Sequence, residues 1–260
     1  MIHGKSIERI FYNAGNGYTV ASYHTEEELP KKVTRSHPEN PGYFQAVGIE
    51  LPTGADVEVE LDGEWKETID PYGNASIENS RRSAVIDMRK IKVKDYPLPE
   101  MKTACDAIIY EVSVRDFTSQ KSTGILHRGT FNGFVEENEY TKEKCTGFSY
   151  LKSLGITHVQ LMPVMDFGSV NEIYPELHYN WGYDPIQYRV PEGSFSIAPQ
   201  NPYDRIFGLV NLVEECHKAG IRVNLDVVFN HVYDKETHFF ENTVPNYYFQ
   251  MNEQGDFSNG

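Results

Sequence analysis

Up to residue 68 the chain alternates between short β-rich stretches and turns. The stretches ERIFYN, GYTVASYHT, GYFQAVGIEL and DVEVELDGEW are separated by the turn signals GNG, NPG, PTG and DG. Valine, isoleucine and aromatic residues in short runs between such turns are typical of antiparallel strands. We therefore predict a small all-β domain, a barrel or a sandwich, over residues 1–68.

Residues 69–105 form a polar and irregular stretch. DPYGNAS and KDYPLPE are rich in turn-forming residues, and the short apolar piece SAVIDM is a candidate for one more strand. We predict a linker here.

From residue 106 the pattern changes to alternating strands and helices. DAIIYEVSV, ITHVQLMPV and IRVNLDVVF are apolar runs of strand length. GFSYLKSLG between the first two is predicted as a short helix that ends at Gly155. Strand–helix–strand alternation predicts parallel strands with right-handed crossovers, and therefore an α/β fold over residues 106–260.

The longest predicted helix is NPYDRIFGLVNLVEECHKAG, residues 201–220. Asn201 is placed to cap its amino end, Pro202 suits its first turn, and Gly220 suits its end. Helical spacing predicts one apolar face made of Ile206, Val210, Val213 and Cys216.

Charge and composition exclude several kinds of partner. Lys and Arg number 24 against 38 Asp and Glu, which gives a net charge of −14. Phosphate backbones and anionic lipids bind positive charge, so this balance argues against nucleic acid and membrane surfaces. No apolar run reaches the roughly 18 residues of a membrane span.

The three cysteines, Cys105, Cys145 and Cys216, show neither a disulfide framework nor a metal-ligand spacing. The first ten residues lack the apolar core of a signal peptide. We therefore expect reduced thiols, a cytoplasmic protein, and no metal or other cofactor.

Polar residues follow the third predicted strand. Asn224 and Asp226 share one face of that strand, and Asn230 and His231 come just after it. In parallel sheets, functional groups gather at the ends of strands, because the loops there vary while the sheet holds them. The alternative is an Asp that caps the following loop and a surface His.

A second candidate segment, HYNWGYDPIQYRVPEGSF at residues 178–195, follows the second strand. Its rings, Tyr179, Trp181, Tyr183 and Tyr188, surround Asp184. Aromatic rings bury flat area at low entropic cost and stack on sugars or bases. The alternative is a long loop held in place by its own aromatic residues.

Several motifs in this half resemble one family. DVVFNHV is similar to the first conserved region of glycoside hydrolase family 13, the α-amylase family, and YNWGYDP resembles a segment of its debranching members, the type I pullulanases. AIIYEVSVRDFT, GFSYLKSLGITHVQLMPVMDF, VPEGSFS and VPNYYFQMNEQG resemble the same enzymes in the same order. The resemblance spans residues 68–260 and implies the first three strands of a (β/α)₈ TIM barrel.

The resemblance also implies roles for individual residues. Tyr183 would stack on the sugar just before the cleaved bond, and His231 would bond the hydroxyls of the same sugar. Asp226 would be a structural acid and Asn230 would brace the loop of His231. The remaining residues, Trp181, Asn180, Asp184 and Tyr179, would shape a site that binds α-glucans such as pullulan, glycogen or starch. One departure is Asn224, which stands where that family usually has an aliphatic residue and which therefore needs a partner.

The groups that would break a glycosidic bond are missing from the sequence. Retaining glycosidases use two carboxyl groups about 5–5.5 Å apart. In this family they follow the fourth and fifth strands, and residues 1–260 contain no GFRFD-like segment, no later Glu region and no terminal HD pair. We expect no catalytic residue and no activity in this chain alone. Three parallel strands would also leave two open edges, so we expect residues 106–260 to be unstable alone.

The amino-terminal stretch resembles a different family. IERIFYNAGNGYTVASYHT, QAVGIELPTG and VEVELDGEWKET are similar to the amino-terminal domain of RecD-type DNA helicases, whereas residues 69–90 resemble the end of a carbohydrate-binding β-sandwich. The chain would then be a fusion; the alternative is a divergent sandwich module. Residues 1–68 carry six basic and twelve acidic residues, a balance of −6, and no GxxxxGK[ST] loop occurs.

Three functional hypotheses remain: part of a debranching glycosidase, a non-catalytic α-glucan-binding protein, and a DNA-helicase accessory domain fused to a hydrolase segment. Two lesser candidates have bland explanations. Glu111 and Asp116 flank Arg115 and are expected to form structural ion pairs with it, and His238 is expected to lie in a loop.

Overall fold

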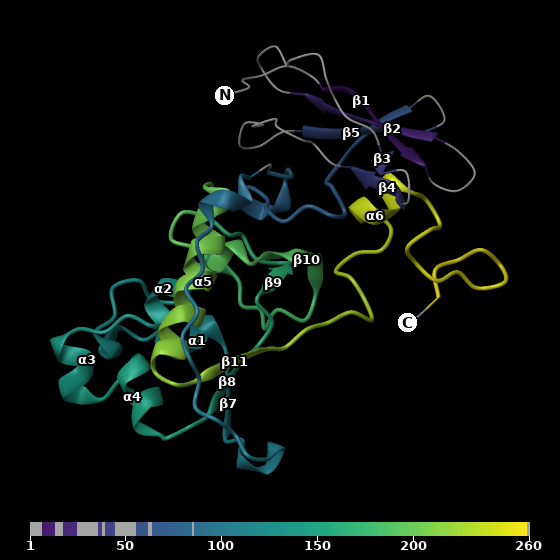
Figure 1. Cartoon of the computed structure of the whole chain (residues 1–260). Coiled ribbons are helices and arrows are strands. Elements are labelled where there is room, and N and C mark those ends of the chain that lie inside the picture. Colours follow the sequence, from purple (N-terminus) through teal and green to yellow (C-terminus); the bar gives the residue numbers. More distant parts are fainter. Residues whose placement is uncertain are drawn as a thin grey trace. The chain divides into compact units, whose positions relative to one another are not determined.

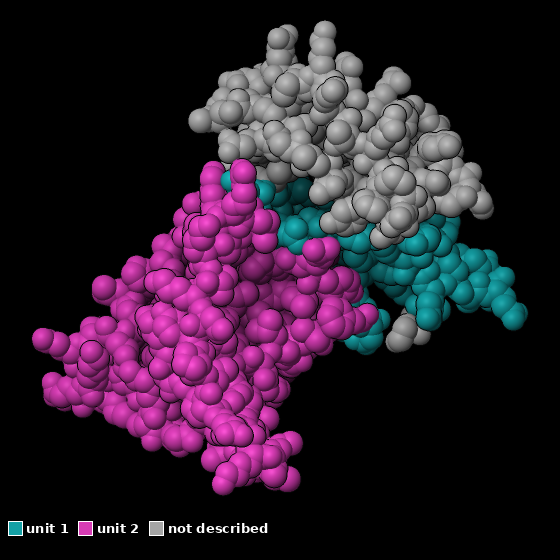
Figure 2. Space-filling view, viewed as in Figure 1, with its two compact units in different colours: residues 1–87, 230–260 teal, residues 88–229 magenta. Residues whose placement is uncertain are grey.

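The computed structural model describes residues 7–13, 18–24, 36–37, 40–44, 56–61, 64–84 and 86–258. The chain divides into two compact units (Figures 1 and 2). Residues 1–87 and 230–260 make up the first unit, and residues 88–229 make up the second. The division of the chain at residues 68 and 105 stays a prediction.

Two antiparallel sheets are seen in the amino-terminal part of the first unit. Four strands form one sheet in the order β1-β2-β5-β6, and β3 pairs with β4. Strands are confirmed in ERIFYN, GYTVASYHT and DVEVELDGEW. The prediction of a turn at NPG is wrong, because these residues begin β4. The turn signals GNG, PTG and DG lie outside the described residues. The strands are β1 Ile7–Asn13, β2 Tyr18–His24, β3 Ser36–His37, β4 Asn40–Phe44, β5 Asp56–Leu61 and β6 Glu64–Thr68.

The candidate strand SAVIDM is wrong in the residues described. Ser83 makes only an isolated bridge to Ser76, and the 3-10 helix η2 begins at Met88. The Ser76–Ser83 bridge closes a turn that contains the 3-10 helix η1, Glu78–Ser80, with Asn79 at φ 55°. The backbone at Ser83 therefore closes this turn and does not start a longer strand.

Helix α6, Phe239–Thr243, also belongs to the first unit. His238 caps it, since its Nδ1 accepts the backbone N–H of Phe240 at 3.2 Å, and its ring packs against Phe239 and Phe249. His238 lies in a loop, as expected, but it is buried there, with 5% of its surface exposed. Thr68 Oγ1 donates to the carbonyl of Phe239 at 3.1 Å, which ties β6 to this helix.

The second unit is built on a parallel sheet of the order β11-β8-β7. Ile109 and Arg222 both pair with His158, and Val112 and Leu225 both pair with Leu161, so the strands run without a bulge. The parallel α/β arrangement predicted from the alternating pattern is confirmed. The strands are β7 Ile109–Val112, β8 His158–Leu161 and β11 Arg222–Leu225.

Helix α5, Pro202–Lys218, crosses from the second strand to the third. Its predicted ends are confirmed: Asn201 Oδ1 accepts the N–H of Tyr203 at 3.1 Å, and Gly220 has φ 75°. Its predicted face is partly wrong. The buried positions are Pro202, Arg205, Gly208, Leu212 and Cys216, while Ile206, Val210 and Val213 are half-buried. Gly208 allows α5 to lie close to Phe131, because a Cβ at this position would stand 3.1 Å from Cβ of Phe131.

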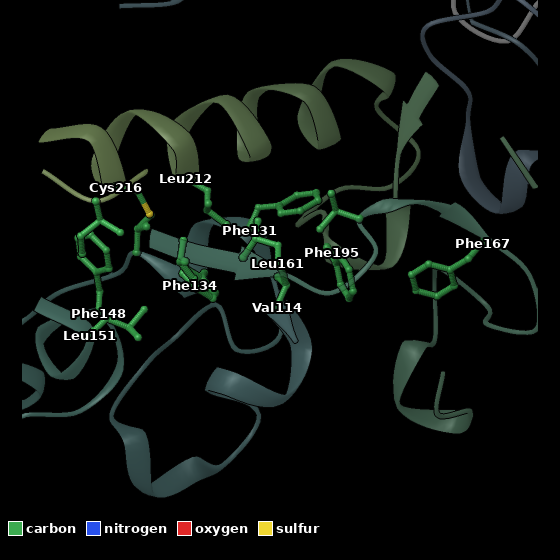
Figure 3. Close-up of a cluster of buried hydrophobic side chains, with 14 residues drawn as sticks. Val114, Phe131, Phe134, Phe148, Leu151, Leu161, Phe167, Phe195, Leu212 and Cys216 are labelled. Carbon is green, nitrogen blue, oxygen red and sulfur yellow. The ribbon is translucent and has the colours of Figure 1, made fainter. Parts of the chain in front are cut away.

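The core of the second unit lies between α5 and the sheet (Figure 3). Val159 and Leu161 of β8 are fully buried and belong to the same hydrophobic cluster as Leu212 and Cys216 of α5. The same core contains Phe131 and four other phenylalanines, namely Phe134, Phe148, Phe167 and Phe195. One face of the sheet therefore packs against the helices, and polar residues lie on the other face.

The loop after β8 is more ordered than the sequence indicates. Residues 178–195 contain β10, which pairs with β9 in an antiparallel hairpin that has two register shifts. The remaining elements of this unit are α1 Val114–Thr118, α2 Phe131–Phe134, α3 Glu139–Lys144, α4 Gly147–Ser153, β9 Met165–Phe167, β10 Pro185–Pro191, and the 3-10 helices η2 Met88–Lys90, η3 Ala104–Asp106, η4 Lys121–Thr123, η5 Pro175–Leu177 and η6 Gly193–Phe195.

Among the described residues, no helix is long and apolar enough to cross a membrane. Cys105, Cys145 and Cys216 are free thiols, the first two exposed and the third buried. Burial raises the pKa of the Cys216 thiol to about 12, so this thiol is an apolar core group.

Candidate functional site

The sheet face that is turned away from the core carries a polar row. Glu111, Gln160 and Asn224 are in register across β7, β8 and β11. Gln160 Nε2 donates to Glu111 Oε2 at 3.0 Å. The register neighbour of Asn224 on β8 is Gln160. The same alternation sends Asp226 to this face, as the sequence pattern predicts.

Tyr183 and Asp226 meet at the carboxyl ends of these strands. The Tyr183 phenol donates to Asp226 Oδ2 at 2.7 Å, while the Asp226 backbone N–H continues the ladder to Leu161 O at 2.9 Å. The bond to Asp226 raises the Tyr183 pKa to about 12, and burial and the charge of Glu111 act in the same direction. The ring is 37% exposed, so a ligand can reach it.

The segment before Tyr183 is held by its own polar side chains. Asn180 Oδ1 accepts the N–H of Gly182 at 2.7 Å, and Asn180 Nδ2 donates to Asp184 Oδ1 at 2.7 Å. Ser169 Oγ donates to the other oxygen of Asp184 at 2.9 Å. Gly182 is required here, because its φ is 89° and a Cβ would lie 2.9 Å from Pro163 O. Asn180 and Asp184 therefore fix the turn on which the aromatic residues stand.

Tyr179 and Trp181 are joined to residues that follow β7. Trp181 Nε1 donates to Tyr179 Oη at 2.6 Å, and Tyr179 Oη donates to Asp116 Oδ2 at 2.5 Å. The Arg115 guanidinium lies 5.4 Å from the Tyr179 ring centre and donates to the carbonyl of His178 at 2.6 Å. The hydrogen bond to Asp116 is the main cause that raises the pKa of Tyr179.

The expected ion pairs of Arg115 are wrong. No such pair with Glu111 or Asp116 occurs in this described segment, because Glu111 bonds Gln160, Asp116 bonds Tyr179, and Arg115 reaches His178. The sequence does not indicate this arrangement, since Asp116 and Tyr179 are 63 residues apart along the chain.

Asn230 and His231 belong to the first unit, whereas the other predicted site residues belong to the second. Both are exposed, and His231 Nδ1 lies 3.2 Å from Asn230 Oδ1. This contact fits Asn230 as a brace for the histidine. Their roles toward a ligand stay predictions.

A buried charged cluster was not found from the sequence. Asp166, Glu172 and Glu192 place carboxylate oxygens within 4.8 Å of one another, and Arg205 enters the cluster from α5. Arg205 contacts both oxygens of Glu172, at 2.8 and 3.2 Å, and lies 3.9 Å from Asp166. The spacing of these four charged residues along the sequence matches no motif, so the sequence does not indicate that they meet.

The guanidinium of Arg205 supplies the positive charge in this cluster. Arg205 is fully buried, and Glu172 and Asp166 raise its pKa against the opposing effect of burial. Burial raises the pKa of Glu192 well above its usual range, and Glu172 and Asp166 add to this effect. Glu192 also accepts the N–H groups of Phe167 and Ser194, at 3.0 and 2.7 Å. The cluster thus ties α5 to the β9–β10 hairpin that carries the candidate site.

A cavity of about 540 Å³ lies elsewhere in the second unit. Gly155, Ile156 and Thr157 before β8 and Gly220 before β11 are among its lining residues. It is therefore at the amino ends of the strands, opposite to Tyr183 and Asp226. Ligand sites of parallel sheets lie at the carboxyl ends, so this cavity is not the candidate site.

Comparison with known proteins agrees with the motifs. Residues 144–258 match the family model described as "Alpha amylase, catalytic domain". The chain is 40% identical over 200 residues to a pullulanase of Bacillus subtilis (strain 168), a match that covers 76% of this chain and 28% of that protein.

Solved structures show the same likeness. A pullulanase of Anoxybacillus sp. LM18-11 complexed with maltotetraose is 34% identical with a TM-score of 0.78, covering 100% of this chain and 37% of its own. A type I pullulanase of Bacillus subtilis str. 168 complexed with maltose gives a TM-score of 0.81 at 32% identity, covering 100% and 37%.

This chain spans between about a quarter and two fifths of the length of these relatives. It has an α/β fold with part of a TIM barrel, it is similar to one part of the pullulanases, and its residues 144–258 match the α-amylase catalytic-domain model.

Proposed function

We propose that this chain supplies the sugar-binding side of an α-glucan debranching hydrolase of the pullulanase type, which hydrolyses α-1,6-glucosidic links with retention. The observation that carries the proposal is the Tyr183–Asp226 hydrogen bond at the carboxyl ends of the parallel strands. It lies in the stretch that is similar to pullulanases, two of which are described as complexes with maltotetraose and maltose.

Each predicted residue takes a role that its contacts support. Tyr183 presents a ring to a sugar face, and Asp226 orients that ring. Asn180 and Asp184 hold the turn, with Trp181 and Tyr179 as the outer wall. His231 would bond sugar hydroxyls, and Asn230 would hold its imidazole.

Bond cleavage is assigned to residues outside this sequence. A retaining mechanism needs a nucleophile and an acid/base about 5–5.5 Å apart. The resemblance gives a catalytic role to neither carboxylate near Tyr183, that is Asp226, which accepts from Tyr183, and Glu111, which accepts from Gln160. We therefore propose that the 260 residues bind α-glucan without cleaving it, which is also what a non-catalytic glucan-binding protein would do.

The test is calorimetric titration of the chain with maltotetraose, alongside reducing-sugar release from pullulan. Tyr183→Ala should weaken binding about tenfold, since about 1.4 kcal/mol of stacking is lost. Tyr150→Ala is the matched control, because that tyrosine of α4 is 40% exposed and far along the chain. Equal affinity in all three proteins would refute the proposed site. Sugar release by the chain would refute the assignment of cleavage to other residues.

For residues 1–67 the resemblance to RecD-type helicases stays a prediction of a fused accessory domain. The balance of −6 over residues 1–68 opposes phosphate binding. We expect no salt-dependent binding to single-stranded DNA, and measurable binding that weakens with salt would favour the helicase-derived alternative.

A further inference from the structure

We propose that Asp116 and Arg115 are positioning residues that hold Tyr179, and that Tyr179 in turn sets the indole of Trp181 as a second sugar-stacking surface, distinct from the ring of Tyr183. The inference rests on the proposed function, because the ligand is the same α-glucan.

The hydrogen bonds have only one possible direction. An ionised carboxylate only accepts, so Tyr179 Oη must donate to Asp116 across 2.5 Å. An indole N–H only donates, so Trp181 Nε1 must donate to the same Tyr179 oxygen across 2.6 Å. The Tyr179 hydroxyl thus uses its proton on one side and a lone pair on the other. Removing Asp116 would free the hydroxyl to rotate.

Arg115 fixes the ring of Tyr179 from its face. Its guanidinium lies 5.4 Å from the ring centre, and its Nη1 is held by the carbonyl of His178 at 2.6 Å. A face that a guanidinium covers is not available to a sugar. Tyr179 is therefore better suited to support Trp181 than to bind the ligand itself.

The indole of Trp181 has two apolar faces, and its N–H already donates to Tyr179. Its ring meets Tyr179 edge to face at 6.5 Å and 82°, and the side chain remains 60% exposed. With its N–H already bonded, the indole can bind a ligand only by stacking. Glucose residues suit such a surface, because their equatorial hydroxyls leave the CH faces of the ring apolar.

The arrangement links two separate parts of the fold. Asp116 and Arg115 lie in α1, directly after β7, while Trp181 lies in the loop that leads to β10. The orientation of the wall residue after the second strand therefore depends on the turn after the first strand.

The chain has two tryptophans, Trp65 and Trp181, so a Trp65→Phe background makes Trp181 the one tryptophan reporter. In this background we would titrate maltotetraose against Asp116→Ala, Tyr179→Phe, Trp181→Ala and the double variant Asp116→Ala/Tyr179→Phe. Asp95→Ala is the matched control, since Asp95 is also an exposed aspartate of the second unit. Affinity comes from calorimetry, and the freedom of the indole comes from acrylamide quenching and fluorescence anisotropy.

We expect each single variant at 116 and 179 to weaken binding about five- to tenfold, and to lower the anisotropy of Trp181. The double variant should be no weaker than either single one, because both act through the same hydrogen-bonded chain. Asp95→Ala should match the background. Asp116→Asn keeps an acceptor oxygen and should restore most of the affinity, which a loss of folding at this position would not allow.

Two results would overturn the inference while leaving the proposed function in place. One is unchanged affinity in the variants at 116, 179 and 181 when Tyr183→Ala still weakens binding. The other is full additivity of Asp116→Ala and Tyr179→Phe. If the background protein does not bind maltotetraose at all, the proposed function fails and this inference fails with it.

Discussion

The phenol of Tyr183 donates a 2.7 Å hydrogen bond to Asp226 and so joins the segment after the second parallel strand to the end of the third. Tyr183 follows a turn in which Gly182 takes a left-handed conformation. An already oriented ring loses less entropy when it stacks on a ligand, so under the proposed function we expect Asp226 to favour binding. This relationship motivates the first two predictions.

Asp226→Asn should lower the pKa of Tyr183 from about 12 toward the ordinary value of about 10. The Asp226 carboxylate accepts a hydrogen bond from the neutral phenol and repels the phenolate. The asparagine amide has no charge and does both less strongly. The measurement is an absorbance titration of tyrosinate, taken as the difference between each protein and its Tyr183→Phe partner. Asp95→Asn should leave this difference unchanged, and the prediction is wrong if Asp226→Asn also leaves it unchanged.

Tyr183→Phe separates the ring from its hydroxyl. The stacking ring remains and the bond to Asp226 is lost, so the affinity for maltotetraose should fall by no more than about threefold, against about tenfold for Tyr183→Ala. Calorimetry on both variants checks the ratio. Equal losses would mean that the hydroxyl, and not the ring, carries the binding.

Arg205→Met should lower the free energy of unfolding by about 3–5 kcal/mol, because buried carboxylates would lose their compensating charge. Arg205 contacts both oxygens of Glu172 and is fully buried. Urea unfolding followed by circular dichroism gives the value.

The matched surface control for Arg205 is Lys144→Met. Lys144 pairs with Glu143 at 2.9 Å, but both side chains are more than half exposed. Such a pair contributes about 0–1 kcal/mol at most. A similar loss in both variants would contradict the structural role of the buried cluster.

Stability should depend on pH through Glu192, whose pKa is raised by burial and by Glu172 and Asp166. The folded state then holds a proton that the unfolded state releases above its pKa of about 4.3. The contribution of Glu192 to stability is therefore complete below that pH and is lost as pH rises toward the raised pKa.

Glu192→Gln should remove this dependence. Above about pH 4.3 the wild-type chain should lose stability relative to the variant by up to about 1.4 kcal/mol per pH unit. Urea unfolding of both proteins between about pH 4.5 and 8, in steps of about half a pH unit, gives the difference in their free energies of unfolding. A difference that does not change with pH would mean that Glu192 is ionised in the folded state as it is in the unfolded one.

The elements that are coded locally were predictable from the sequence. The strands at 109–112, 158–161 and 222–225 and the caps of α5 at Asn201 and Gly220 were predicted, because apolar periodicity and capping act within a few residues. The face of Asp226 also followed from the alternation of strand side chains. The choice of residues around Tyr183 came from motif resemblance.

Only the tertiary structure decided which distant groups meet. Asp116 bonds Tyr179, Tyr183 bonds Asp226, and Arg205 joins Glu172, across separations of 33 to 63 residues. The sequence by itself determined the type and order of the elements, since backbone hydrogen bonding and hydrophobic period are local. The partners of Asp116 and Arg205 depend on how the helix and the hairpin pack on the sheet. Packing is a non-local balance of burial and charge, and residue spacing does not encode it.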